Sequence, residues 1–297
     1  MKTPQKLHLP EGDLMAFEES ILRDQEPSAN YQKVDVPGIS QGRQSRVTVL
    51  EFKLSQGAEA VVWKRMGVGK GLTEQEAELL HDRLRKYRRS LRDLGWNIPK
   101  LFHTHTVQVG SEWQIYSYEQ FIPGGDADFA VRDALEPNYR KWQLLRAAIE
   151  TLGEYPERLL KPRVLCDREV TALPHGLDLK LANLVSDGSI VYFVDLFGPK
   201  ELTSAGDWLS YTPKLDGLPQ ENLLAVTATR EGAILRLFRL AEKSWIESGS
   251  AQKDAIRSEL ESVLTQSGIP QRERDFILIE IDNEYPWLDE LYAESAV

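Results

Sequence analysis

The sequence contains very little cysteine. Cys166 is the single cysteine among its 297 residues, so no disulfide can form within the chain. A cysteine-rich zinc site is excluded for the same reason. No motif around Cys166 indicates a nucleophile, and we expect it to be a small buried residue. The scarcity of cysteine fits a reducing compartment.

Long apolar runs are also missing. Nowhere do about eighteen apolar residues follow one another, as a membrane-spanning helix would require. The first residues, MKTPQKLHLPEGD, carry two lysines but no apolar segment follows them, unlike a secretory signal. We therefore expect a cytoplasmic protein with no membrane partner.

Basic residues are outnumbered. The chain has 36 Lys and Arg against 46 Asp and Glu, a formal net charge of −10. A broad nucleic-acid surface needs concentrated basic side chains, so we expect no nucleic-acid partner. The basic run KYRRSLR (residues 86–92) is interpreted as the solvated face of a helix. The acidity favours a cationic substrate only weakly.

What the sequence does contain is enough apolar material for a substantial core, with 41% hydrophobic residues and seven Trp. Alternating patterns predict a hairpin over residues 47–66 and two further strands over 101–109 and 113–122. Between them, Thr73 and Glu76 form a capping box that begins a long helix.

A Pro-Gly-Gly break after Phe121 separates this part from a mainly helical remainder. Apolar residues at helical spacing predict three helices there, around residues 142–152, 223–241 and 256–264. One hairpin, with Asp187-Gly188 at its turn, is expected to interrupt them. The expected fold class is α+β, with an N-terminal extension (1–35), a sheet-rich N-lobe (36–122) and a helical C-lobe (123–297).

Polar residues at fixed offsets mark the start of that hairpin. The segment DLKLANLV carries Asp178, Lys180 and Asn183, and VDLFGP presents Asp195 after the hairpin. Alone, each Asp or Asn is typical of a turn. As a set, their order resembles the catalytic loop and metal motif of the protein-kinase-like fold, including its small-molecule phosphotransferases of the aminoglycoside and choline type. The resemblance runs from Val47 to Gly198, about half of the chain.

This resemblance implies a bilobal fold that uses ATP and Mg²⁺. In the C-lobe, Asp178 would orient the acceptor hydroxyl and Lys180 would reach the transferring phosphate. Asn183 and Asp195 would hold Mg²⁺ through their oxygen atoms.

In the N-lobe, the resemblance implies that Lys64 binds the nucleotide phosphates and pairs with a helix glutamate. Glu76 lies on the buried stripe of the helix and is the preferred partner, although the capping box is an equally good use of it. Glu119 to Phe121 would supply backbone groups to the adenine, and Asp126 or Asp128 would meet the ribose.

Several features depart from the family pattern. His175 precedes Asp178 by three residues because Leu177 is inserted, and the metal motif reads D-L-F-G. GVGKG (residues 67–71) lacks the Ser or Thr of a phosphate loop and is interpreted as a flexible link. PGISQGRQS (residues 37–45) occupies the place of a Gly-rich loop without its full pattern.

The absence of an A-P-E segment after Pro199 favours a small-molecule acceptor over a regulated protein kinase. Lys180, in contrast, favours a protein kinase over an aminoglycoside-type enzyme. The function expected is ATP- and Mg²⁺-dependent transfer of phosphate to a small-molecule hydroxyl. A pseudokinase that regulates a partner, and an enzyme that modifies protein, are the alternatives. The acceptor is expected to bind the helices after Leu202, where Trp208, Tyr211 and Trp245 would line a pocket or fill the core.

Overall fold

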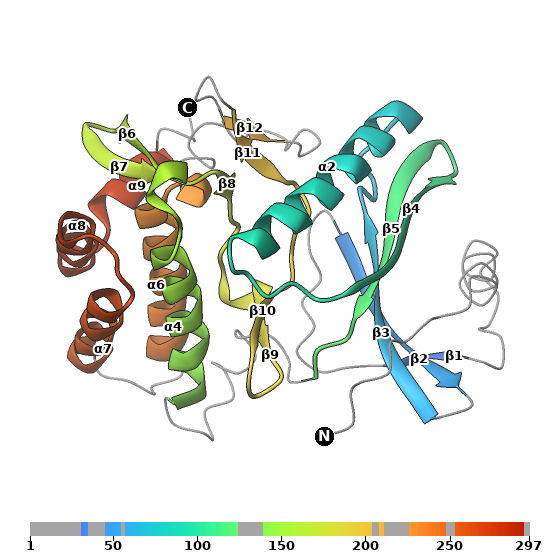
Figure 1. Ribbon diagram of the computed structural model, residues 1–297, viewed down its shortest axis with the longest axis horizontal. Coiled ribbons are helices and arrows are strands. Elements are labelled where there is room, and N and C mark those ends of the chain that lie inside the picture. Colours follow the sequence, from blue (N-terminus) through green and yellow to red (C-terminus); the bar gives the residue numbers. More distant parts are fainter. Residues whose placement is uncertain are drawn as a thin grey trace. The chain divides into compact units, whose positions relative to one another are not determined.

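The structure is a computed structural model that describes residues 31–34, 45–54, 57–123, 139–203, 208–210, 226–247 and 253–293. The chain divides into two compact units, Met1–His81 with Pro99–Phe121, and Asp82–Ile98 with Ile122–Val297. Small antiparallel sheets and several helices confirm the α+β class (Figure 1). The division differs from the expected lobes in that residues 82–98 are grouped with the second unit.

The first unit is built on an antiparallel sheet with strand order β1-β2-β3-β5-β4. Both predicted strand pairs are confirmed. Alternation along β3 places Val61 and Trp63 on one face, where they pack with Tyr116 and Tyr118. Lys64 therefore lies on the opposite face. The strands are β1 (Tyr31–Val34), β2 (Ser45–Leu54), β3 (Gly57–Met66), β4 (Leu101–Val109) and β5 (Glu112–Gln120).

The predicted long helix is α2 (Glu74–Asp93), and it begins at the predicted capping box. The Thr73 amide donates to the Glu76 carboxylate (2.8 Å), and the Glu76 amide donates to Thr73 Oγ1 (3.3 Å). Apolar residues spaced by three or four form the buried stripe. Its members are Leu80, Leu84, Tyr87 and Leu91.

Helices make up most of the second unit. α4 and α6 lie side by side, α7 packs on α4, and α8 and α9 pack on α6 (Figure 1). The first and third apolar stripes identified in the sequence fall on α4 and α7, and the second falls on α6 from Ile234 onward, since α6 begins later than predicted. The bounds are α4 (Tyr139–Gly153), α6 (Arg230–Glu247), α7 (Lys253–Gln266), α8 (Gln271–Asp282) and α9 (Pro286–Ala293). Within the described residues, no helix is long and apolar enough to cross a membrane.

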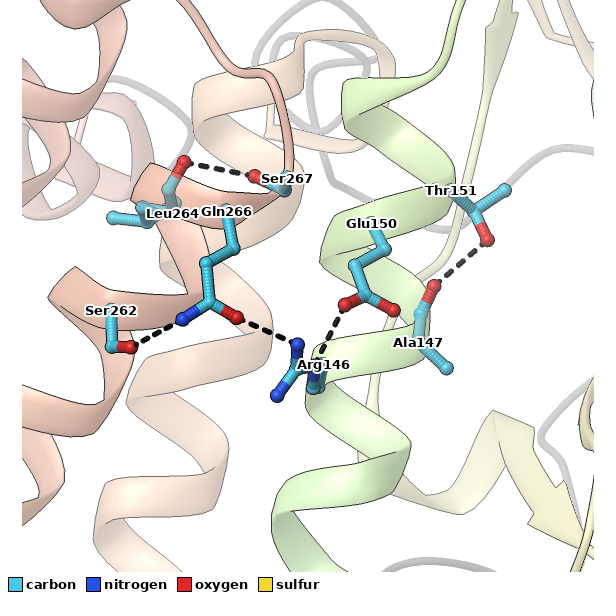
Figure 2. A network of polar contacts seen from close by, with 8 residues as sticks. All are labelled: Arg146, Ala147, Glu150, Thr151, Ser262, Leu264, Gln266 and Ser267. Carbon is cyan, nitrogen blue, oxygen red and sulfur yellow. Dashed lines mark hydrogen bonds and ion pairs between the residues drawn. The ribbon is translucent and has the colours of Figure 1, made fainter.

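A polar network joins α4 to α7 (Figure 2). The Arg146 guanidinium donates to Glu150 on its own helix (2.7 Å) and to Gln266 Oε1 on α7 (2.7 Å). At the end of α4 the two segments touch, because a Cβ added at Gly153 would lie 1.8 Å from the Ser267 carbonyl oxygen. Glycine at position 153 is what allows this approach.

The second unit contains more strands than the sequence predicted. The hairpin of β9 (Leu184–Ser186) and β10 (Val191–Phe193) is confirmed. A further hairpin pairs β6 (Lys161–Leu165) with β7 (Arg168–Ala172), just after a short 3₁₀ helix, η1 (Glu157–Leu159). A third small sheet has the order β12-β11-β8. Its strands are β8 (His175–Gly176), β11 (Lys200–Leu202) and β12 (Trp208–Ser210).

The turn between β6 and β7 explains why this hairpin was missed. Cys166 and Asp167 both adopt positive φ angles, 47° and 54°, as a two-residue hairpin turn requires. Neither residue is the glycine that usually marks such a turn. The prediction that Cys166 is buried is also wrong, because a turn residue stays partly accessible to solvent.

Four buried polar residues, Thr171 on β7, Arg230 and Glu231 on α6, and Glu273 on α8, form what we call the buried polar cluster. The Thr171 amide donates to both Glu231 carboxylate oxygens (3.1 and 2.8 Å). Its hydroxyl donates to Glu273 (2.8 Å), and the Arg230 guanidinium donates to the other Glu273 oxygen (3.1 Å). One arginine thus faces two buried carboxyl groups. Burial, together with the charge of Glu273, raises the pKa of Glu231 from 4.5 to about 7.

This raised pKa predicts a pH-dependent stability. Between pH 4.5 and 7 the folded protein keeps a proton on Glu231 that the unfolded chain has lost. The stabilisation is therefore complete below pH 4.5 and disappears as the pH rises through 7. Denaturation at a series of pH values should show that wild type loses up to ~3 kcal/mol relative to Glu231→Gln between those limits.

The exposed Glu259 on α7 provides the control for this measurement. Glu259→Gln should leave the pH profile of unfolding as in wild type. A Glu231→Gln profile that is parallel to wild type would refute the assignment.

Candidate active site

In the segment Leu177–Leu181, burial alternates between apolar and charged side chains. Leu177, Leu179 and Leu181 are buried. Asp178 and Lys180 are partly accessible, with their side chains 29% and 35% exposed. The sequence L-D-L-K-L therefore anchors the loop through its leucines and presents its two charged residues together.

Leu177 packs in the core of the second unit. Its side chain is fully buried and its amide donates to the Thr227 carbonyl oxygen (2.6 Å). Just before it, the Tyr87 hydroxyl donates to the Gly176 carbonyl oxygen (2.5 Å). Gly176 and Leu177 thus fix the loop to neighbouring elements before the chain reaches Asp178.

His175 lies on β8, which pairs with β11. Its ring packs edge-on against Tyr87 at a centroid distance of 5.7 Å. Burial lowers the pKa of His175, so the neutral form is favoured. His175 therefore packs against Tyr87, and its neutral form adds no positive charge next to Asp178.

Two hydrogen bonds join Asn183 to both sides of the predicted metal site. Its side-chain amide donates from Nδ2 to the Asp178 carbonyl oxygen (2.8 Å). Its backbone carbonyl accepts from the Val194 amide (2.9 Å), at the base of the β9–β10 hairpin. Asp195 follows directly and accepts from the Phe197 amide (3.3 Å). The structure therefore brings Asp178, Asn183 and Asp195 into one local assembly. Asn183 is the last residue of the short 3₁₀ helix η2 (Leu181–Asn183).

The Asp178 carboxylate is held among cationic side chains. Arg236 on α6 donates to Oδ1, and Lys180 Nζ lies 3.4 Å from Oδ2. Burial raises the pKa of Asp178, but the charges of Arg236, Lys180 and Lys200 and the Arg236 hydrogen bond outweigh it. The pKa therefore lies well below its ordinary value, and Asp178 stays ionised.

Lys200, the first residue of β11, is a buried lysine at this site, with 8% of its surface exposed. Its stem lies over Gly176, where an added Cβ would be 2.9 Å from both Cβ and Cδ of the lysine. Burial lowers the pKa of Lys200, while the negative charge of Asp178 acts in the opposite direction. Within the described part of the chain, no carboxylate forms an ion pair with Lys200.

Arg236 and Lys200 did not figure in the sequence prediction. Arg236 had a recognisable signal, because it lies within the stretch AILRLFRL of α6 (residues 233–240). An arginine between two leucines on a core-facing stretch requires a partner. Lys200 follows the D-L-F-G-P run and had no comparable signal.

The residues present are suited to a magnesium ion. Because Asn183 uses Nδ2 as a donor, its Oδ1 remains available as a ligand. With a carboxylate oxygen of Asp195, this gives two hard oxygen ligands, the number that Mg²⁺ commonly takes from a protein when substrate phosphates supply others. Among the residues described, His, Cys, Asp and Glu form no group of three or more able to hold a metal by themselves.

In the first unit, the partner of Lys64 is Glu119 (2.9 Å). Opposite Val62 in the strand register, Glu119 is a diagonal neighbour of Lys64 on the same sheet face. Ser117 donates to its other oxygen (3.2 Å). Glu76, the partner preferred from the sequence, accepts hydrogen bonds from Thr73 in the capping box. Glu119, expected to offer backbone groups to the adenine, contacts Lys64 with its side chain.

Two backbone amides of the link GVGKG, between β3 and α2, form hydrogen bonds with a carboxylate. The Gly69 and Gly71 amides donate to the two carboxylate oxygens of Glu112 (2.9 and 3.1 Å). These hydrogen bonds, that from Gly69 foremost, lower the pKa of Glu112. All three glycines have positive φ angles, as a tight link requires. The prediction of a link between strand and helix agrees with this arrangement.

Some predicted residues lie outside the described part of the chain. These are the N-terminal extension apart from β1, the glycine-rich stretch 37–44, Asp126, Asp128 and Tyr211. The side chains of Trp208 and Trp245 are likewise not described. Phe121 follows β5 and is half-buried.

Comparison with protein-family models gave no match, and no curated protein matches the sequence.

Proposed function

We propose that this protein is a phosphotransferase with a bilobal protein-kinase-like fold, which moves the γ-phosphate of ATP to a hydroxyl of a small molecule. The observation that supports it is the assembly of Asp178, Asn183 and Asp195. Asn183 is hydrogen-bonded to the Asp178 carbonyl on one side and to Val194, the neighbour of Asp195, on the other. These hydrogen bonds hold the three residues near one another, which supports the proposal because phosphoryl transfer depends on fixed positioning.

Asp178 would act on the acceptor. An aspartate whose pKa is lowered remains ionised, and it can accept the hydrogen bond of a hydroxyl and orient its oxygen toward the phosphate. Phosphoryl transfer through a loose transition state needs such positioning more than a strong base. Lys180, beside it, would compensate negative charge on the group being transferred.

Asn183 and Asp195 would hold Mg²⁺ through Oδ1 and a carboxylate oxygen. When bound, the ion neutralises charge on the ATP phosphates. In the first unit, the largely buried pair of Lys64 and Glu119 is suited to a nucleotide-binding lysine, because the carboxylate orients the ammonium.

ATP consumption with Mg²⁺, measured against a panel of amines, amino alcohols, sugars and nucleosides, tests the proposal. We expect turnover with at least one acceptor, and Asp195→Ala should lower kcat by at least about a hundredfold because a metal ligand is lost. Asp93→Ala, at the exposed end of α2, is the matched control and should keep full activity. No product with any acceptor, together with identical behaviour of Asp195→Ala, would refute it.

The ion pair between Arg236 and Asp178 favours a second candidate, a pseudokinase that binds nucleotide without turning it over. An arginine seated on the acceptor-binding carboxylate would block the hydroxyl. The same experiment separates the two, because calorimetry would then show ATP binding while no phosphorylated product forms. Labelling of added protein with γ-labelled ATP would indicate a protein acceptor instead.

A further inference from the structure

Positive charge exceeds negative charge around Asp178. Lys180, Lys200 and Arg236 all act on this carboxylate, while Asp195 is the other negative group that acts on Lys200. Among the described residues, three cations thus act on Asp178, in a protein whose formal net charge is −10. The net negative charge of the whole chain therefore does not indicate the local charge at this site.

Lys200 is the buried cation of this group. The residue is more than nine-tenths buried, and among the described residues no carboxylate forms an ion pair with it. A largely buried ammonium without an ion-pair partner favours the binding of an anionic ligand. Its stem packs against Gly176, which holds the side chain at this site.

The Arg236 guanidinium has hydrogen-bond donors that its contact with Asp178 does not use. Its contact with Asp178 uses Nη1 only, and its side chain is 17% exposed. A guanidinium carries five donors in a planar fork and can bind a second oxyanion while it keeps the first. Lys180, beside Asp178, adds a third cationic head.

We propose that Lys200, Arg236 and Lys180 bind an oxyanion of the acceptor, so that the acceptor is a hydroxy compound that also carries a phosphate or carboxylate group. The identity of the acceptor rests on the proposed function, whereas the oxyanion site stands without it. The anion would complete the charge balance beside Asp178, with its hydroxyl next to the carboxylate that orients it. In this arrangement Arg236 positions the acceptor and does not block it.

Binding of inorganic phosphate without nucleotide, measured by calorimetry, is the first test. Wild type should bind it, and Lys200→Met, which keeps the apolar stem, should weaken binding at least about tenfold, as expected for one charge-assisted hydrogen bond. Lys180→Met provides a second variant at a partly exposed position and should weaken binding several-fold. Lys161→Met, on the exposed face of β6, should bind as wild type does. Failure of wild type to bind phosphate would overturn the site.

The second test compares acceptors that share a three-carbon hydroxy skeleton and differ in whether they carry an anionic group: glycerol, glycerate and glycerol phosphate. We expect a kcat/KM at least about tenfold higher for the anionic members, with Lys200→Met raising KM for the acceptor and not for ATP. A rise in KM for ATP alone would assign the cations to the nucleotide and overturn the proposal. Phosphate binding that depends on Lys200, without turnover of any acceptor, would retain the oxyanion site and reject the phosphotransferase. Turnover that favours glycerol would retain the phosphotransferase and reject the oxyanion site.

Discussion

Replacing Asp178 by asparagine is expected to lower kcat by about 10²–10⁴-fold while KM for ATP stays within about twofold of wild type. Asparagine has the same size and can still accept a hydrogen bond from Arg236, but it lacks the charge that orients and finally deprotonates the hydroxyl. Because the loop is anchored by buried leucines and by the Leu177 amide, the backbone should keep its position. Steady-state kinetics with the best acceptor measures the effect.

Asp187 offers a matched control, since it is an aspartate at the exposed tip of the β9–β10 hairpin. Its carboxylate accepts from the Ser189 and Ile190 amides (2.9 and 2.8 Å) and has no expected contact with substrate. Asp187→Asn should therefore change kcat by less than about twofold. Full activity of Asp178→Asn, with circular dichroism as in wild type, would remove Asp178 from the reaction.

Replacing Arg230 by methionine should destabilise the protein by about 3–5 kcal/mol. Arg230 is 2% exposed and its guanidinium pairs with the equally buried Glu273. Methionine fills most of the volume but leaves the Glu273 carboxylate without a cation in a medium that solvates it poorly. The free energy of unfolding from urea denaturation gives the cost.

The pair of Arg257 and Asp282 is the control for this prediction. It joins α7 to α8 at the surface (2.7 Å), so that water and salt screen it. Arg257→Met should cost no more than about 1 kcal/mol. The double variant Arg230→Met with Glu273→Gln should recover much of the loss, because it removes the unpaired charge. A loss in Arg230→Met as small as in Arg257→Met would show that burial does not set the cost.

Local patterns predicted the elements that have strong local signals. The Asp187-Gly188 turn, the Thr73 capping box and the alternating strands of the first unit are each encoded within a few residues, and each formed as predicted. The β6–β7 hairpin turns through Cys166 and Asp167 at positive φ without a glycine, so its signal was too weak. The short strands β8 and β11 pair residues far apart in the chain, which no local pattern encodes.

The candidate site likewise has residues that a local pattern predicts and residues that only the packing of distant elements brings in. Asp178, Lys180, Asn183 and Asp195 belong to one continuous motif and were predicted together. Arg236 reaches this motif from a helix more than fifty residues away, and its contact with Asp178 depends on how α6 packs. The contact of Lys64 with Glu119 was not predicted, because it depends on the register of β3 against β5, which helix periodicity does not encode.

The contact of Glu112 with Gly69 and Gly71 has a consequence for how anions compete at this link. Glu112 is an intramolecular ligand, present at an effective concentration of the order of millimolar or above because the chain tethers it. A dissolved phosphate would have to exceed that concentration to displace it. The Gly69 and Gly71 amides of this glycine-rich link are therefore already bound by a carboxylate of the protein itself.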